Sequence, residues 1–281
     1  MSFEGAFLQI AEAAKHANAP EEGDYIKDGL LHCHKCNTPK ECIIPYPFEP
    51  NRYDKRSCTC KCKREKIAKE EAERQRREFE KQVKKLRRAG FPDDDMQNWT
   101  FDKDDNKNEH ITSVARKYAE NFEKMRATGK GLLLYGDVGT GKTFAAACIA
   151  NALIDRGVSC MVTNFMRLIN TIWEVQDKQT YIDDLNRFSL LVFDDLGSEA
   201  TTEHRSEIVF NIIDSRYRAG LPFIITTNLT AQELKNTTDI RKQRIYSRLF
   251  ERCIPVEVKG ADRRREKLKD EFQTYADLLG L

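Results

Sequence analysis

Residues 136–143 bring together three glycines, a lysine and a threonine in the order G-x-x-x-x-G-K-T. Glycines in this spacing let backbone N–H groups surround phosphate oxygens, and the positive end of the following helix dipole favours negative charge. We expect Lys142 to reach the β- and γ-phosphates of a nucleotide and the Thr143 hydroxyl to ligate Mg²⁺. The predicted nucleotide-binding residues are the loop and the residue that follows it: Gly136, Asp137, Val138, Gly139, Thr140, Gly141, Lys142, Thr143 and Phe144.

The residues on both sides predict the elements that must position this loop. Residues 132–135 form the apolar run of a short buried strand, and residues 144–147 open a helix. A glycine-rich turn with a chance lysine is the alternative interpretation. Strand, loop and helix agree with one another, so the pattern favours a phosphate-binding loop.

A second apolar run, residues 190–193, ends in two acids, Asp194 and Asp195. Residues 159–163 predict a strand between this run and the loop, with a helix after that strand. At this position Asp194 would hold the magnesium through water, and Asp195 could polarise the attacking water. We therefore predict that both acids take part in nucleotide hydrolysis.

Two more candidates follow along the chain. Asn228 ends the apolar run 223–227, where its amide could orient water beside the γ-phosphate. Arg244 and Arg248 lie four residues apart on one face of a probable helix, from which one arginine could point out of the subunit. The alternatives are a turn former for the asparagine and a solvated face for the arginines. The order of the whole set favours the functional interpretation.

Residues 101–265 resemble the AAA+ ATPases and, within them, the DnaC, DnaI and IstB group of helicase loaders and transposition helpers. The most specific segments are 131–136 running into the loop, 194–199, 244–249 and 260–264. The resemblance implies an α/β fold, a parallel P-loop sheet with helices on both faces. It further implies that Arg248, supported by Arg244, is an arginine finger donated in trans, and therefore that the protein self-assembles.

One position departs from the pattern of this family. Many AAA+ motors have glutamate directly after the metal-binding aspartate, whereas Asp195 is one methylene shorter and Glu199 is a possible helper. We therefore expect slow ATP turnover, stimulated by single-stranded DNA or by assembly. Arg263 and Arg264 are candidates for a further arginine at the nucleotide.

The first ninety residues carry a different signal, because six of the nine cysteines fall between residues 33 and 62. A C-x-x-C pair and a second cluster some twenty residues later fit a tetrahedral structural zinc site. Four ligands suffice, and the predicted set is Cys33, Cys36, Cys60 and Cys62, with Cys58 as a substitute. Disulfides and a redox C-x-x-C are the alternatives.

Residues 61–88 predict a long charged helix, with thirteen basic and six acidic residues and almost no apolar ones. This helix could follow a phosphate backbone, or it could be a solvated linker. Gly90 and Pro92 should stop it. We predict a small zinc-binding domain with its charged helix over residues 1–90 and an ATPase domain over residues 91–281.

The composition limits the remaining possibilities. A chain of 281 residues can hold one good core and a small metal-stapled module. The net charge of +2 leaves any DNA binding to local surfaces. The sequence has no run of 18 or more apolar residues, so we expect no membrane span. The first residues lack the basic segment and the long apolar core of a secretory signal, so we expect no such signal. We expect a cytoplasmic protein with reduced thiols.

The resemblance implies a loader of the replicative DNA helicase, with ATP, Mg²⁺ and Zn²⁺ as cofactors. The N-terminal domain would dock on the helicase, and the ATPase domain would bind single-stranded DNA through residues 164–181 and 198–205. This pairing of domains resembles phage-borne members of the family. An IstB-like transposition helper and a non-catalytic, ATP-switched adaptor are the alternatives, and the zinc module argues against the first of them.

Overall fold

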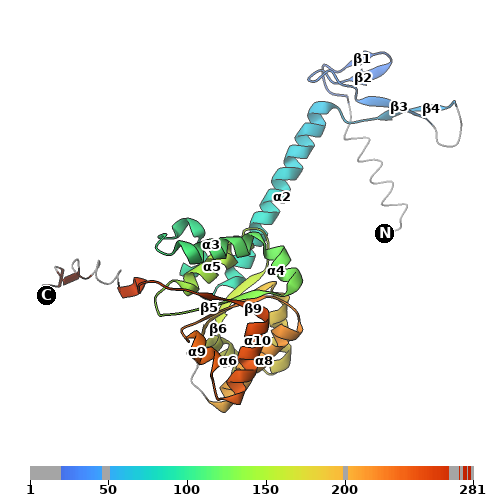
Figure 1. The fold of residues 1–281 in the computed structure, drawn as a ribbon. Helices are drawn as coiled ribbons and strands as arrows, with labels where there is room; N and C mark the ends of the chain where they lie inside the picture. The colour runs from blue at the N-terminus through green and yellow to red at the C-terminus, as the bar shows by residue number, and fades with distance from the viewer. Residues whose placement is uncertain are drawn as a thin grey trace. The chain divides into compact units, whose positions relative to one another are not determined.

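The computed structural model describes residues 20–45, 51–198 and 202–265, together with 272, 275, 276, 278 and 279 (Figure 1). The chain forms two compact units, Met1–Phe79 and Glu80–Leu281. The boundary between the two units falls within the long helix α2 (Lys61–Gly90), whereas the sequence pattern predicted it after residue 90. Val83 and Leu86 explain the difference, since these last turns of α2 pack against the core of the second unit.

The first unit consists of two antiparallel hairpins and the beginning of α2. The first hairpin pairs β1 (Tyr25–Lys27) with β2 (Leu30–His32), and the second pairs β3 (Glu41–Pro45) with β4 (Tyr53–Ser57). Asp28 and Gly29 both have positive φ at the first turn, as the Asp-Gly loop of a tight hairpin requires. Only Cys33, Lys40 and Cys60 are buried among the described residues of this unit, so these residues form no hydrophobic core among themselves.

The second unit is built on a five-stranded parallel sheet in the order β6-β7-β8-β5-β9. Leu132 and Leu134 face one side of this sheet and Leu133 faces the other, as the two-residue period of a strand requires. The strands, in chain order, are β5 (Gly131–Tyr135), β6 (Cys160–Asn164), β7 (Leu190–Leu196), β8 (Phe223–Thr227) and β9 (Cys253–Glu257).

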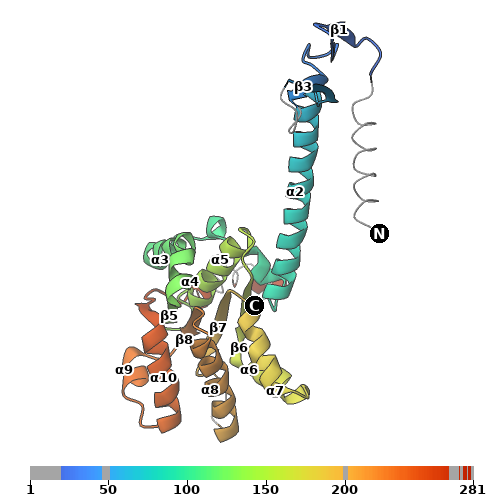
Figure 2. The ribbon, with the colours of Figure 1, turned by 90° about the vertical axis from the view of Figure 1, so that its right-hand side faces the viewer.

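Helices cover both faces of the sheet, which confirms the predicted α/β fold class (Figure 2). One face packs against α3 (Glu109–Glu120), α4 (Phe122–Thr128) and α5 (Lys142–Ile154). The other packs against α6 (Phe165–Glu174), α7 (Lys178–Asp184), α8 (Glu203–Arg218), α9 (Ala231–Lys235) and α10 (Ile240–Arg252). Short 3₁₀ turns complete the unit: η1 (Asp95–Asn98), η2 (Phe101–Lys103) and η3 (Leu185–Arg187).

The strand order determines where polar groups can meet. Strands β7, β8 and β5 are consecutive neighbours and all parallel, so their carboxyl ends lie at one edge of the sheet. Ligands bind at this edge in open α/β sheets. In the part of the chain that the structure describes, no helix is both long enough and apolar enough to cross a membrane.

Candidate functional site

The loop between β5 and α5 is shaped by glycines that have close neighbours. Gly136 and Gly139 have φ of 134° and 78°, which other residues rarely adopt. A Cβ on Gly136 would lie 2.6 Å from the carbonyl oxygen of Val258, and one on Gly139 would lie 1.9 Å from Asp262 Oδ1. Because Gly141 also has positive φ and precedes α5, the loop N–H groups and the helix N-terminus can face the same ligand.

Lys142 is bent back over this loop. Its Nζ donates hydrogen bonds to the carbonyl oxygens of Gly136 at 2.8 Å and Asp137 at 2.6 Å. Burial lowers the pKa of Lys142, and the nearby carboxylates of Asp195, Asp137 and Asp194 partly oppose that shift. A phosphate group would be a stronger acceptor for the ammonium than two neutral carbonyls.

Asp194 joins the loop to two strands of the sheet. Its Oδ1 accepts hydrogen bonds from Thr143 Oγ1 at 2.7 Å and from Thr226 Oγ1 at 2.6 Å. The hydroxyl of Thr143 and the carboxylate of Asp194 are hard oxygen donors at contact distance, so this pair fits Mg²⁺. Thr226 was not predicted from the sequence, because a threonine inside an apolar strand carries no motif signal.

Asp195 has an unusual backbone conformation for a non-glycine residue, with φ of 59°. The pairing of β7 with β8 shifts register between Phe193 and Leu196, so β7 leaves its ladder with β8 at the two acids. The Asp195 N–H donates to Thr226 Oγ1 at 2.9 Å, and Asn228 Nδ2 donates to Asp195 Oδ1 at 2.9 Å. The second acid and the predicted asparagine are therefore in direct contact.

These groups surround a cavity of about 590 Å³. Trp99 lies at its border, with its ring centroid 5.9 Å from that of Phe144. A hollow of about 690 Å³ between α3 and the edge strand β9 is larger, but it contains none of the predicted site residues. The cavity at the loop is lined by Trp99, Lys103, Asp105, Val138, Gly139, Thr140, Gly141, Lys142, Thr143, Phe144, Asp194, Asp195, Thr226, Asn228, Arg263 and Arg264.

The segment after β9 closes against the loop. The Arg263 N–H donates to the carbonyl oxygen of Gly139 at 3.1 Å. Arg263 Nη1 lies 3.0 Å from Asp105 Oδ1 and 3.8 Å from Asp104 Oδ1, which ties this segment to the turn before α3. Arg263 and Arg264 thus add two cations to the wall of the cavity.

Arg248 lies away from the cavity of its own chain. Its Nε and Nη2 both contact Asp214 Oδ1, at 2.7 and 2.6 Å, and its guanidinium lies 4.5 Å from the ring centroid of Phe210. Arg244 stacks on the same ring at 4.2 Å. In the single chain Arg248 is therefore held by α8, so its predicted role as a finger stays a prediction. Glu199, the possible helper of Asp195, lies outside the described residues.

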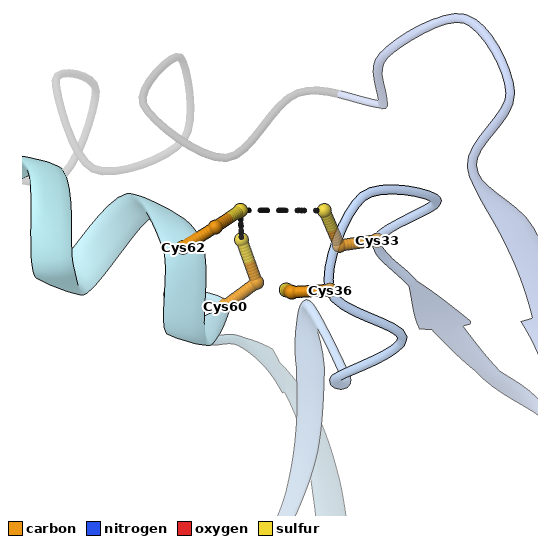
Figure 3. A group of neighbouring side chains, drawn as sticks. All are labelled: Cys33, Cys36, Cys60 and Cys62. Atoms are coloured by element: carbon orange, nitrogen blue, oxygen red, sulfur yellow. Dashed lines mark hydrogen bonds between the residues drawn. The ribbon is translucent and has the colours of Figure 1, made fainter.

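Four cysteines meet at one point in the first unit (Figure 3). Cys33 and Cys36 lie on the loop after β2, Cys60 directly precedes α2, and Cys62 lies in its first turn. Their sulfur atoms are all within 4.8 Å of one another. Cys62 Sγ is 3.7 Å from Cys33 Sγ and 3.5 Å from Cys60 Sγ, close to the roughly 3.8 Å that a tetrahedron of Zn–S bonds requires. Cys58 is not in this group, and its Sγ instead lies 3.5 Å from the carbonyl oxygen of Pro39.

The thiols of this group do not ionise independently. A hydrogen bond with Thr38 lowers the pKa of Cys36 to about 5. Hydrogen bonds with Cys60 and Cys36 raise the pKa of Cys62 to about 12. Crowded sulfurs cannot all carry charge unless a cation is present, so the donor set fits a thiolate-binding metal such as Zn²⁺.

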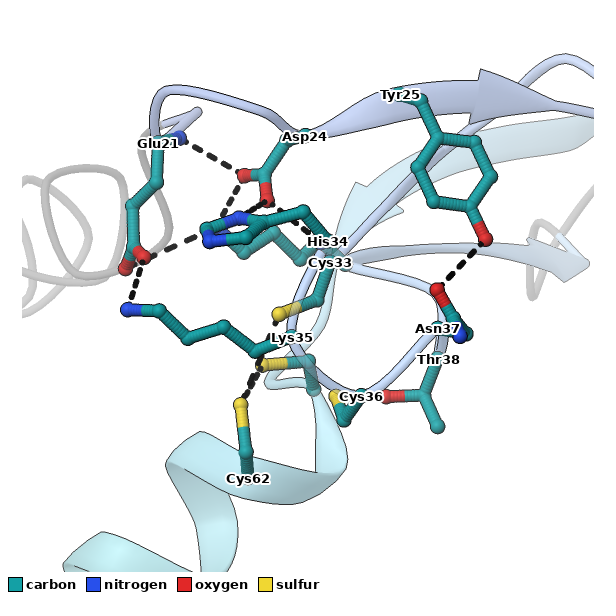
Figure 4. A network of polar contacts seen from close by, with 12 residues as sticks. Glu21, Asp24, Tyr25, Cys33, His34, Lys35, Cys36, Asn37, Thr38 and Cys62 are labelled. Atoms are coloured by element: carbon teal, nitrogen blue, oxygen red, sulfur yellow. Dashed lines mark hydrogen bonds and ion pairs between the residues drawn. The ribbon is translucent and has the colours of Figure 1, made fainter.

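A polar network supports the cysteine loop from outside (Figure 4). Asp24 accepts hydrogen bonds from the N–H and Nδ1 of His34, both at 3.1 Å, and pairs with the buried Lys40. The hydrogen bond from Lys40 holds the pKa of Asp24 well below its ordinary value. Thr38 Oγ1 accepts a hydrogen bond from the N–H of Lys61 at 2.9 Å, which ties the loop to the first residue of α2. The network fixes the two cysteine pairs against each other.

Curated relatives match this chain over part of its length. It is 28% identical over 169 residues to the replicative helicase loader DnaI of Bacillus subtilis, with 56% of this chain and 53% of the relative covered. It is 27% identical over 142 residues to the replicative helicase loader DnaC of Escherichia coli K12, with 49% and 56% covered. A putative insertion sequence ATP-binding protein of Sinorhizobium fredii is 30% identical over 105 residues, covering 36% and 35%. The chain thus spans about half the length of the loaders it matches.

Solved structures and a family model agree with these relatives. A crystal structure of DnaI aligns with a TM-score of 0.53 at 26% identity, covering 64% of this chain and 99% of that one. A DnaC helicase loader aligns with a TM-score of 0.51 at 25% identity, covering 59% and 100%. The family model for IstB-like ATP binding proteins matches residues 55–271, which is more than half of the chain. This chain therefore belongs to the IstB-like ATP binding protein family, in the DnaC/DnaI/IstB group of AAA+ ATPases.

Proposed function

We propose that this protein is an ATP-dependent loader of the replicative DNA helicase. The observation that carries the proposal is the meeting of the phosphate loop, the acid pair and Asn228 at one cavity, in a chain whose matches include two replicative helicase loaders. The first unit would dock on the helicase, and the second would bind ATP and single-stranded DNA. Membership of the family supports ATPase activity in general terms.

ATP binding would rearrange the polar contacts of the cavity. Lys142 would exchange the carbonyl oxygens of Gly136 and Asp137 for the β- and γ-phosphates. Thr143 and Asp194 would hold Mg²⁺, which neutralises phosphate charge when it is bound. The loop N–H groups and the N-terminus of α5 would face the remaining phosphate oxygens.

Asp195 and Asn228 would place the attacking water. Asn228 Nδ2 donates a hydrogen bond to the carboxylate of Asp195, so the two side chains lie together. The carboxylate would accept a hydrogen bond from the water, and the amide N–H would donate one to it. Because the aspartate is shorter than glutamate and already engaged, we propose slow hydrolysis, accelerated by single-stranded DNA or assembly. This rate would suit a switch that releases the helicase after loading.

Self-assembly would bring a second chain to the cavity. Arg248 would serve the neighbour's ATP as a finger, with Arg244 beside it on the same Phe210 ring. To do so Arg248 must leave Asp214, so we propose that this ion pair holds the arginine on α8 until a neighbour is present.

A structural zinc ion would hold the first unit together. Among its described residues, two of the three buried side chains are Cys33 and Cys60. Small modules without a hydrophobic core commonly depend on a metal for folding. The predicted ligands Cys33, Cys36, Cys60 and Cys62 form the sulfur group, and reduced thiols agree with a cytoplasmic protein.

The second hairpin offers a surface for the helicase. Cross-strand pairing of Ile43 with Lys55 and of Pro45 with Tyr53 puts Ile43, Pro45 and Tyr53 on one face. Ile43 is 59% exposed and Tyr53 is 64% exposed, which is unusual for large apolar side chains side by side. We propose that this apolar face contacts the helicase.

A transposition helper is the second candidate function. The family model and the relative from an insertion sequence favour it, because both belong to that class. A helper of this kind would act on duplex DNA, whereas a loader would respond to single strands. A non-catalytic adaptor, in which ATP only locks a conformation, is the third candidate and would show no turnover.

The ATPase prediction concerns Lys142 and Asp194. Lys142→Ala should weaken ATP binding at least tenfold, because about 2 kcal/mol of charge-assisted hydrogen bonding is lost. Asp194→Asn should retain binding and lower turnover by roughly 100-fold. Fluorescent-nucleotide titration and phosphate release measure the two effects, with Lys124→Ala, at an exposed position, as the control.

The turnover of the wild-type protein also separates the candidate functions. Stimulation of turnover by duplex DNA as strong as by single strands would favour the transposition helper, and no turnover at all would favour the adaptor.

The zinc prediction concerns the sulfur group. Protein purified without chelator should contain one zinc per chain by elemental analysis, and Cys60→Ser should lower that ratio well below one. Cys42→Ser is the matched control, because Cys42 is outside the group of four sulfurs. Chelation should increase proteolysis of the first unit while ATP binding persists. Metal-free protein that resists proteolysis equally well would contradict the zinc site.

The docking prediction concerns the second hairpin. The double variant Ile43→Asp, Tyr53→Asp should capture at least tenfold less replicative helicase in a pull-down, with zinc content and ATP binding unchanged. Ile44→Asp is the matched control, because Ile44 points to the opposite face of the same hairpin and is 47% exposed. Wild-type capture by the double variant would exclude this face as the docking surface.

A further inference from the structure

The last turns of α2 differ in charge from the rest of that helix. Earlier turns balance their cations with intrahelical ion pairs, such as Lys61–Glu65, Lys66–Glu70 and Arg77–Glu73. Residues 81–90 contain five basic residues and no acidic one. This part of α2 belongs to the second unit, so its surroundings are those of the ATPase core.

Four of these five cations share one face of the helix. Lys81, Lys84, Lys85 and Arg88 follow the spacing i, i+3, i+4, i+7, and all four are exposed. We call them the α2 basic row. The fifth cation, Arg87, forms an ion pair with Asp155 and donates a hydrogen bond to the carbonyl oxygen of Gln97. The opposite face, with Val83 and Leu86, is packed against the core.

The α2 basic row has no ion-pair partner within the described residues. None of its four side chains forms an ion pair or a hydrogen bond there, and together with Ala89 they line a hollow of about 500 Å³. Like charges at this helical spacing repel one another. The row is therefore a place where an external polyanion would relieve an unfavourable interaction.

We propose that the α2 basic row binds the phosphate backbone of single-stranded nucleic acid. This inference rests on the proposed loader function and adds a DNA contact outside the segments predicted for the ATPase domain. The row contains no aromatic side chain for base stacking, so it would contact phosphates without sequence preference. An acidic protein fits less well, because protein interfaces have an apolar centre and this hollow offers only Ala89.

The size of the row agrees with a short contact on one strand. A helical rise of 1.5 Å per residue places Lys81 and Arg88 about 10 Å apart along the axis. Four cations over this length would engage a few consecutive phosphates of a flexible strand. Each neutralised phosphate of a single strand contributes about 0.7 to the salt dependence of binding.

The proposal is tested by replacing the four basic side chains and measuring the affinity for single-stranded DNA at several salt concentrations. The variant Lys81→Gln, Lys84→Gln, Lys85→Gln, Arg88→Gln keeps helix-forming side chains and deletes four charges. With a labelled oligo-dT and a non-hydrolysable ATP analogue, fluorescence anisotropy should show at least tenfold weaker binding. The slope of log affinity against log salt should be smaller by about 3. Basal ATP hydrolysis should not change.

Two further variants control for the total charge of the protein and for the change of side chain within the row. Removing four exposed cations elsewhere, by Lys117→Gln, Lys124→Gln, Arg126→Gln and Lys235→Gln, should leave both affinity and slope near wild type. The variant Lys81→Arg, Lys84→Arg, Lys85→Arg should bind like wild type, because it keeps all four positive charges of the row.

Several results would overturn the proposal. Unchanged affinity and slope in the row variant would refute the row while leaving the loader function intact. Loss of duplex binding alone would assign the row to duplex DNA, and loss of helicase capture alone would assign it to an acidic protein surface. A wild-type protein that binds no nucleic acid with ATP present would refute the row and the DNA-binding part of the proposed function together.

Discussion

The pair of hydrogen bonds to Asp194 is the interaction on which the nucleotide site depends. Through Oδ1, this carboxylate joins Thr143 at the beginning of α5 to Thr226 on β8, while its own backbone belongs to β7. Three elements that are far apart in the sequence are thereby fixed within one hydrogen bond of each other. The same Thr226 hydroxyl accepts from the N–H of Asp195, which stabilises the left-handed backbone there and directs that carboxylate toward Asn228.

The first unit depends on a different kind of constraint. It buries almost no apolar surface in its described part, and its order comes from the cysteine group and from the Asp24 network around it. In a unit of this kind, metal binding by the cysteine group would be coupled to folding. Because the two units depend on different interactions, a change in conditions can affect one of them without the other.

Much of the site could be predicted because each chemical group follows an apolar run. The loop and Asn228 come directly after β5 and β8, and Asp194 lies near the carboxyl end of β7. Neighbouring parallel strands bring such ends together. Thr226 and Asp214 could not be predicted in this way. The first lies inside a strand, and the second holds Arg248 from a neighbouring helix 34 residues away, a distance at which spacing gives no signal. The position of the unit boundary inside α2 could not be predicted either, because it depends on the packing of the last turns of α2 against the second unit.

A loader of the replicative helicase must bind that helicase in a way that ATP controls. The most direct measurement mixes the intact protein with the host helicase, with and without ATP and single-stranded DNA, and determines the mass of the complexes by light scattering. If this protein is a helicase loader, a discrete complex should form with ATP and dissociate as ATP is hydrolysed on single-stranded DNA. A helicase that elutes alone, while this protein still binds ATP, would exclude the loader function.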